Sequence, residues 1–336
     1  MPIAPIRTVD MHTGGEPVRI VVNGYPPVEG TTILDKRRYA RDHLDHLRRM
    51  LMFEPRGHAD MYGVIPVEPD HPEADLAVLF MHNEGYSTMC GHATIALARW
   101  AVDTGLVPTT GDETPVAIQV PSGLVRATVA TTGSESGRAR FESVPSFVAH
   151  ADLSVVVPGH GEVTLDIAFG GAFYAFVDAG TYGLDLGTSK VRDLVDVAWA
   201  TTRAVQEAGV PLPHPDHQDL QFLYGTILTD GNDAWSDQPT RNLCVFAERQ
   251  VDRSPTGSGV SARIAIQRAK GLIDLGVERV FESVVGSQFT GKALRTTKVG
   301  DKEAVVVEVG GRANYVSESI FTLEGDDQLP SFLLRE

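Results

Sequence analysis

The sequence contains very little cysteine, and this scarcity excludes the classes of protein that depend on it. Only two cysteines, Cys90 and Cys244, occur in 336 residues. A chain of this length with two cysteines has no disulfide scaffold, and no closely spaced cysteine pair indicates a metal site. We therefore expect a protein of the reducing cytosol, with no metal and no disulfide bonds.

Basic residues and long apolar runs are also scarce. The chain has 44 acidic and 29 basic residues, which give a formal net charge of −15, and it has no basic stripe. This balance argues against nucleic acid as a partner and favours a soluble protein. No apolar segment is long enough to cross a bilayer, and the first residues lack the pattern of a secretion signal. We expect neither membrane insertion nor secretion.

The length of the chain predicts two domains, each with enough apolar material for its own core. Strand-like segments are predicted at residues 6–10, 18–22, 61–67, 77–81, 116–120, 124–129 and 139–142. Residues 35–51 are predicted to form one polar helix with an apolar face. Residues 93–102 are rich in good helix formers and apolar throughout, so they predict a buried helix. The pattern indicates a mixed α/β fold.

The second half of the sequence repeats features of the first half in the same order. The matching pairs are residues 10–18 with 166–174, 61–65 with 223–227, 87–92 with 253–258, and 122–128 with 290–296. Four matches in one order favour a duplicated α/β unit over coincidence. We predict one domain at residues 1–150 and another at 151–317, with a C-terminal segment from about 318 to 336 that packs back onto the first domain.

Cys90 is predicted at the N-terminus of the buried helix, directly before Gly91 and His92. The first N–H groups of a helix lack intrahelical partners and the helix dipole is positive there, which favours a thiolate and attracts an anionic substrate. Without this context a cysteine is interpreted as a small buried apolar residue. That interpretation holds for Cys244, which lies in an apolar run at residues 243–246.

The second repeat places Thr256 at the equivalent helix start, followed by Gly257 and Ser258. Two facing copies would bring the N–H groups of both helix starts toward one carboxylate. Groups on opposite sides of a bound amino acid suit proton exchange at the carbon beside its carboxylate. A symmetric racemase needs a second base opposite Cys90, and a threonine hydroxyl does not titrate near neutral pH. The pair of Cys90 and Thr256 therefore predicts impaired racemisation.

The chain resembles the proline racemase family in three motifs and over nearly its whole length. The motifs are Asp-Met-His-Thr-Gly-Gly-Glu-Pro at residues 10–17, Met-Cys-Gly-His at 89–92 and Asp-Arg-Ser-Pro-Thr-Gly-Ser-Gly at 252–259. The resemblance implies an enzyme without a cofactor and a diaminopimelate-epimerase-like fold. In that fold each domain is a curved, mostly antiparallel sheet around a central helix, and the active site lies between the domains. Racemases and 4-hydroxyproline epimerases of the family have cysteine at both helix starts, whereas the Cys–Thr arrangement resembles trans-3-hydroxy-L-proline dehydratases.

By motif position, the resemblance implies that Cys90 is the proton acceptor and that Thr256 occupies the second catalytic position. The substrate-binding residues that it implies are Gly91, His92, Asp252, Gly257 and Ser258. The side chains of His92, Asp252 and Thr256 each have alternative roles. His92 is either a general acid or supplies its backbone N–H and local polarity. Asp252 either accepts from the ring ammonium or caps its own turn or pairs with Arg253, and Thr256 either donates a hydrogen bond or fills space.

The stereochemistry of trans-3-hydroxy-L-proline is compatible with a single base. Its hydroxyl lies opposite the carboxylate, on the ring face that carries the α-hydrogen, so the loss of water is formally syn. We predict a hydro-lyase in which Cys90 takes the α-proton and the β-hydroxyl leaves, giving Δ1-pyrroline-2-carboxylate after tautomerisation. The alternatives are an isomerase, which would be a proline racemase or hydroxyproline 2-epimerase, and a non-catalytic amino-acid-binding protein. Because exposed sheet edges in such domains often pair, we also expect a homodimer in the cytoplasm.

Overall fold

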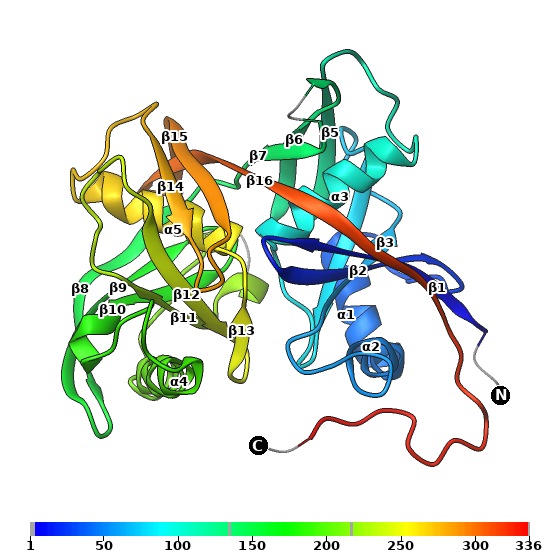
Figure 1. The fold of residues 1–336 in the computed structure, drawn as a ribbon, viewed down its shortest axis with the longest axis horizontal. Helices are drawn as coiled ribbons and strands as arrows, with labels where there is room; N and C mark the ends of the chain where they lie inside the picture. The colour runs from blue at the N-terminus through cyan, green and yellow to red at the C-terminus, as the bar shows by residue number, and fades with distance from the viewer. Residues whose placement is uncertain (1–3, 134–135, 216–217, 335–336) are drawn as a thin grey trace. The chain divides into compact units, whose positions relative to one another are not determined.

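The structure is a computed structural model that describes residues 4–133, 136–215 and 218–334 (Figure 1). The chain divides into two compact units. Unit 1 comprises Met1–Ala139 and Arg312–Glu336, and unit 2 comprises Arg140–Gly311. The ranges predicted from the sequence, 1–150 and 151–317, place both divisions slightly later along the chain. Among the described residues, no helix has the length and apolar character that a membrane span requires.

The described residues of unit 1 form antiparallel hairpins, parallel pairings between neighbouring hairpins, and three helices. Its elements are β1 (Ile6–Thr13), β2 (Glu16–Asn23), α1 (Ile33–His43), α2 (Asp45–Met52), β3 (Tyr62–Val67), β4 (Leu76–His82), α3 (Gly91–Asp103), β5 (Glu113–Val120) and β6 (Gly123–Ala130). The pairing is antiparallel for β1–β2, β3–β4 and β5–β6, and parallel for β2–β3 and β4–β5. The last part of β16 (Lys302–Phe321) pairs antiparallel with β1.

Unit 2 is built in the same way. After β7 (Arg138–Glu142), its elements are β8 (Phe147–Val157), β9 (Gly161–Phe169), β10 (Phe173–Asp178), η2 (Ala179–Tyr182), α4 (Val191–Glu207), η3 (Gln218–Leu220), β11 (Leu223–Thr229), β12 (Thr240–Phe246), β13 (Gln250–Asp252), α5 (Gly257–Ala269), β14 (Glu278–Glu282), β15 (Gln288–Val299) and the first part of β16. The pairing is antiparallel for β9–β10, β11–β12 and β14–β15, and parallel for β10–β11 and β12–β14.

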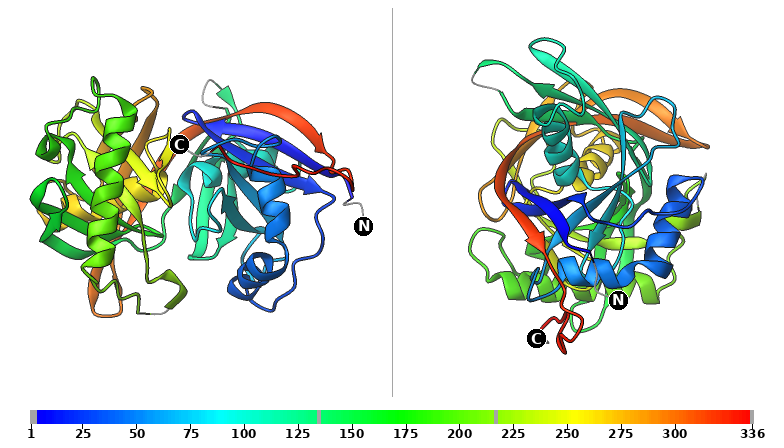
Figure 2. Two further views of the ribbon diagram at one scale, coloured as in Figure 1. Left: turned by 90° about the horizontal axis from the view of Figure 1, so that it is seen from below. Right: turned by 90° about the vertical axis from the view of Figure 1, so that its right-hand side faces the viewer.

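The same alternation of antiparallel and parallel pairing therefore occurs in both units. The two Gly-Gly segments form the turns of the corresponding hairpins β1–β2 and β9–β10. In unit 1, α3 contacts β1, β2, β5 and β6, and in unit 2, α5 contacts β8, β9, β10 and β15 (Figures 1 and 2). The predicted mixed α/β fold, with a central helix packed on a mostly antiparallel sheet in each repeat, is confirmed.

Helix α3 is buried because almost every side chain on it is small or apolar. Ten of its residues are buried, and the exceptions are Arg99, Trp100 and Asp103. Alanines at positions 93, 96, 98 and 101 let the strands approach the helix axis closely. The predicted buried helix at residues 93–102 is confirmed, and the packing on all sides fixes the position of its first turn.

The single helix predicted at residues 35–51 is wrong, because the structure has two helices that meet at Leu44. The backbone of Leu44 leaves the helical region (φ −120°, ψ 10°) and the chain changes direction there. The break lets both helices turn apolar side chains toward one core cluster, to which α1 contributes Ile33 and Ala40 and α2 contributes Leu47 and Leu51. Tertiary burial therefore overrides the continuous helical pattern of the sequence.

Candidate functional site

Cys90 is the N-cap residue of α3 in unit 1, as the sequence predicts. Its backbone is extended (φ −147°, ψ 113°) and the residue is 5% exposed. The thiol sulfur accepts a hydrogen bond from the backbone N–H of Ala93 at 3.4 Å. The carbonyl of Cys90 accepts from both the backbone N–H and the hydroxyl of Thr94, at 3.0 and 2.7 Å. The helix start thus holds the sulfur where N–H groups and the helix dipole stabilise negative charge.

The imidazole of His92 lies directly beside this sulfur. Its Nδ1 atom is 3.1 Å from Cys90 Sγ and its Nε2 atom is 3.7 Å away, while Nε2 also lies 3.2 Å from the carbonyl oxygen of Pro17. A carbonyl only accepts hydrogen bonds, so the contact with Pro17 favours the tautomer that carries its hydrogen on Nε2. The contact places a basic imidazole ring beside the thiol.

Residues far apart in the sequence hold His92 in this orientation. The ring of Tyr62 on β3 contacts the His92 ring edge-on, with the centroids 4.9 Å apart, and its hydroxyl hydrogen-bonds Ser87 Oγ. The hydroxyl of Thr13 on β1 donates to the His92 carbonyl at 2.8 Å. Sequence reasoning did not single out Tyr62 or Thr13. Both lie in repeated segments, at residues 61–65 and 10–18, and that repetition was a signal that could have found them.

In unit 2, Asp252 and Thr256 form a hydrogen-bonded turn before α5. Asp252 ends β13 and is buried, its Oδ1 accepts from Ser254 N–H at 2.7 Å, and its Oδ2 accepts from Thr256 Oγ1 at 2.8 Å. The backbone N–H of Thr256 donates to Ser254 Oγ at 3.1 Å. Asp252 therefore caps its own turn and Thr256 donates a hydrogen bond to it. A carboxylate has about four acceptor sites, so these two bonds leave Asp252 with further capacity.

The backbone of Thr256 is unusual for a β-branched residue. Its φ of 62° and ψ of 93° contrast with the extended backbone of Cys90 at the equivalent position of unit 1, and its side chain does not cap the helix. Such a conformation costs about 1 to 3 kcal/mol and persists only where neighbouring contacts enforce it. Here the carbonyl of the preceding Pro255 accepts from Asn242 Nδ2 at 3.0 Å. The conformation aims the Thr256 hydroxyl at Asp252.

Gly257 and Ser258 are the first two residues of α5, and Gly91 and His92 are the first two of α3. The first N–H groups of a helix precede its intrahelical hydrogen-bond ladder, and such groups can bind an anion. The hydroxyl of Ser258 lies 2.8 Å from the Tyr174 hydroxyl. Gly170 is required beside this turn, because a Cβ there would lie 2.1 Å from the Ser258 carbonyl oxygen. The second Gly-Gly segment therefore packs directly against the helix start.

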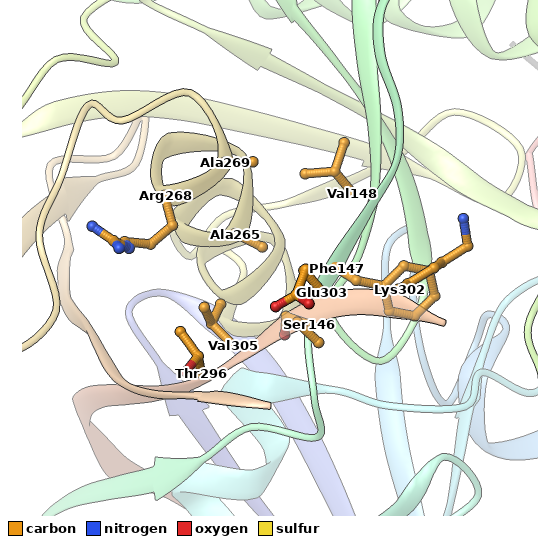
Figure 3. A pocket seen from close by; sticks show the side chains of 11 residues that line it. Ser146, Phe147, Val148, Ala265, Arg268, Ala269, Thr296, Lys302, Glu303 and Val305 are labelled. Atoms are coloured by element: carbon orange, nitrogen blue, oxygen red, sulfur yellow. The ribbon is translucent and has the colours of Figure 1, made fainter. Parts of the chain in front are cut away.

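A pocket of about 330 Å³ lies elsewhere in unit 2, at the C-terminal half of α5 (Figure 3). Ala265 and Ala269 of the helix face Phe147 and Val148 of β8 across it, and none of the site residues predicted from the sequence lines it. Within the described ranges, no group of three or more His, Cys, Asp or Glu side chains is arranged to hold a metal ion.

The chain belongs to the proline racemase family, whose model matches residues 8–332. Two relatives illustrate the likeness. Over 333 residues the chain is 60% identical to the trans-L-3-hydroxyproline dehydratase of Xenopus tropicalis, covering 98% of this chain and 95% of the relative. Over 336 residues it is 59% identical to the trans-3-hydroxy-L-proline dehydratase of Homo sapiens, with the same coverage.

A solved structure extends the likeness to the fold. The crystal structure of a probable proline racemase from Agrobacterium radiobacter K84, with bound carbonate, is similar with a TM-score of 0.91 at 28% identity. The match covers 98% of this chain and 96% of that chain. The family resemblance and the fold that the sequence motifs imply are confirmed.

Proposed function

We propose that this chain is a trans-3-hydroxy-L-proline dehydratase, a hydro-lyase that uses no cofactor. The observation that carries the proposal is the chemical difference between the two helix starts. Cys90 is paired with an imidazole that can take its proton, whereas Thr256 presents a hydroxyl that is already donated to Asp252. The high identity to two relatives named as dehydratases of this substrate supports the same conclusion.

The proposal assigns each charged group of the substrate to residues at the two helix starts. The carboxylate accepts hydrogen bonds from the N–H groups of Gly91 and His92 and from those of Gly257 and Ser258. The ring ammonium donates to Asp252, whose remaining acceptor sites have the opposite charge. Holding both groups places the α-hydrogen toward Cys90 and raises the effective concentration of the base.

The chemistry then needs one base on one ring face. His92 Nδ1 takes the thiol proton, and the Cys90 thiolate removes the α-proton. The electrons of the C–H bond form the double bond between the α- and β-carbons, and the bond from the β-carbon to oxygen breaks. The departing hydroxyl takes a proton from Cys90 and leaves as water, which restores the thiolate. The helix starts stabilise the negative charge that develops on the carboxylate, and the enamine product tautomerises to Δ1-pyrroline-2-carboxylate.

A proline racemase or hydroxyproline 2-epimerase would need a second base for the opposite face. The Thr256 hydroxyl is the group at that position in the repeat, and an alcohol is a poor proton acceptor near neutral pH. An amino-acid-binding protein without turnover would not need the thiol–imidazole contact. These contrasts favour the dehydratase over both alternatives.

Purified protein incubated in deuterium oxide with trans-3-hydroxy-L-proline, trans-4-hydroxy-L-proline or L-proline tests the proposal. We expect pyrroline formation from the 3-hydroxylated substrate alone, without added cofactor and after treatment with a chelator. Inversion at the α-carbon without net dehydration would establish an isomerase instead. Binding without either signal would establish a non-catalytic protein.

Replacement of the thiol gives the first prediction for a variant. Cys90→Ser removes the base and should lower kcat for dehydration by at least about 100-fold. Cys244→Ala is the matched control, since it deletes the other buried thiol, which lies in the core of β12. The control should retain most of the activity. A Cys90→Ser enzyme with nearly full activity would refute the assignment of Cys90.

We also propose a cytosolic homodimer. Two cysteines in 336 residues are typical of proteins in a reducing compartment. The strand β16 exposes three large hydrophobic side chains, Tyr315 (44%), Val316 (62%) and Ile320 (61%). Exposed apolar groups of this size on a strand favour an interface.

A further inference from the structure

Gln250 is a buried polar residue that the structure leaves without a hydrogen-bond partner. It begins β13 and is 4% exposed. Neither Oε1 nor Nε2 of its carboxamide has a partner among the residues that the structure describes. A buried amide without a partner is costly, because the group has lost its bonds to water and gained none in return. Such a side chain points to a ligand that completes its hydrogen bonds.

The position of Gln250 connects it with the turn before α5. Gln250 and Asp252 are two residues apart on β13, so their side chains lie on the same face of the strand. Both are buried, whereas Val251 between them is partly exposed. In the antiparallel pair with β12, Gln250 lies opposite Phe246 and Asp252 lies opposite Cys244. Directly opposed residues share a face. Gln250 therefore lies on the same strand face as Asp252, which receives the Thr256 hydroxyl, and opposite Phe246.

We propose that Gln250 binds the ring hydroxyl of the substrate and thereby selects a 3-hydroxylated ring. The inference rests on the proposed function, which assigns the carboxylate to the helix starts and the ammonium to Asp252 and leaves the hydroxyl as the remaining polar group. Nε2 donates to the hydroxyl oxygen, and Oε1 accepts the hydroxyl hydrogen. Because the carboxamide donor is directed at the oxygen that gains negative charge as the carbon–oxygen bond breaks, it also assists departure of the hydroxyl.

The spacing on β13 is compatible with this contact. Alternate residues of a strand lie about 7 Å apart. The substrate can span that distance. One hydrogen bond of about 2.9 Å would be made at the ammonium and another at the hydroxyl, and these two groups are close together on the five-membered ring. Phe246 beside the carboxamide is an apolar surface for the ring carbons. It is stacked on Tyr224, with ring centroids 5.3 Å apart.

The test is the variant Gln250→Met, which keeps the length of the side chain and removes both hydrogen-bonding atoms. We expect kcat/KM for trans-3-hydroxy-L-proline to fall about tenfold or more. The inhibition constant of L-proline, which lacks the hydroxyl, should change by less than about twofold. Thermal stability of the variant without substrate should be unchanged or higher, since no protein hydrogen bond is lost. If Gln250 had a purely structural role, the variant would instead lose thermal stability.

Gln267→Met is the matched control. Gln267 is also buried in unit 2, but its Nε2 donates to Asp233 Oδ1 at 3.1 Å. This variant should lose thermal stability. Its kcat/KM for trans-3-hydroxy-L-proline and its inhibition constant for L-proline should keep the same relation to each other as in the wild type. Equal weakening of both ligands by Gln250→Met, or no weakening of either, would overturn the role of Gln250 while the wild type still dehydrates the substrate. A wild type that does not dehydrate it would instead overturn the proposed function.

Discussion

Thr256 shows how a residue at one position of a repeat acquires a different role from its counterpart. Cys90 caps α3 through its sulfur, whereas Thr256 turns its hydroxyl away from α5 and donates it to Asp252 at 2.8 Å. The two residues follow equivalent sequence motifs, yet the imidazole of His92 lies beside Cys90 and the residue at the matching position after Thr256 is a serine. From this geometry we propose that Thr256 is a positioning residue that orients the carboxylate of Asp252.

Replacing Thr256 with an isosteric residue tests this positioning role. Thr256→Val removes the hydrogen bond to Asp252 and should lower kcat/KM about tenfold, mainly through KM, because bonds to charged groups are among the stronger ones. Thr256→Ser keeps the hydroxyl and should stay close to the wild type. Steady-state kinetics of both variants decide the matter. Equal losses in both would mean that the threonine methyl group, and not its hydroxyl, is what the site requires.

His82 is the last residue of β4, and its buried environment favours the neutral imidazole. Burial, together with the Arg48 and Arg37 guanidinium groups, lowers the pKa of His82 from 6.5 to about 3. Its Nδ1 accepts from the Glu84 N–H at 3.2 Å, and its carbonyl accepts from Arg48 at 2.7 Å. The ring stacks on Tyr62, which also contacts His92. A neutral imidazole is therefore part of the packing that supports the site.

The lowered pKa of His82 has a defined consequence for stability. The unfolded chain binds a proton at this group near pH 6.5, whereas the native protein binds it only near pH 3. The contribution of neutral His82 to the free energy of unfolding is therefore complete above pH 6.5 and declines as the pH falls toward about 3, by about 1.4 kcal/mol per pH unit.

His82→Gln keeps a neutral acceptor at this position and removes the titration. Urea unfolding at pH 7 and pH 5 should show that the wild type loses about 2 kcal/mol more than the variant over this interval. The same loss in both proteins would show that His82 does not control the acid sensitivity of unit 1.

The helices of unit 1 show how well elements can be predicted from local pattern. The buried helix at residues 93–102 was predictable because its composition is apolar on every side, and a helix of that kind can only be a core element. The division of residues 35–51 into α1 and α2 at Leu44 was not predictable, since the helical periodicity continues across the break. What decides the break is the shared core cluster, which includes Met61, Leu79 and Tyr86 from distant segments.

The assembly proposed for the whole protein is a homodimer that uses the exposed apolar residues of β16, and the chain carries a net charge of −15. We expect light scattering to give twice the chain mass of 36.3 kDa. Ile320→Lys should shift the protein toward a monomer, because a buried lysine without a partner is costly in an interface. Lysine at the exposed Leu106 is the control and should leave the mass unchanged. A monomeric wild type at micromolar concentration would contradict the proposal.

The mixed α/β class, the duplication and the location of Cys90 at the start of a buried helix could all be predicted from the amino-acid sequence. These features depend on local composition, on helix and turn signals and on the order of repeated segments, all of which can be read along the chain. Only the tertiary structure shows the contacts of His92 with the Cys90 sulfur and the Pro17 carbonyl, and the hydrogen bond from Thr256 to Asp252. It also shows that the Gln250 carboxamide has no hydrogen-bond partner among the described residues. Hydrogen-bond partners depend on which distant segments pack together and on local backbone angles. Neither can be predicted from the residue pattern at a single position.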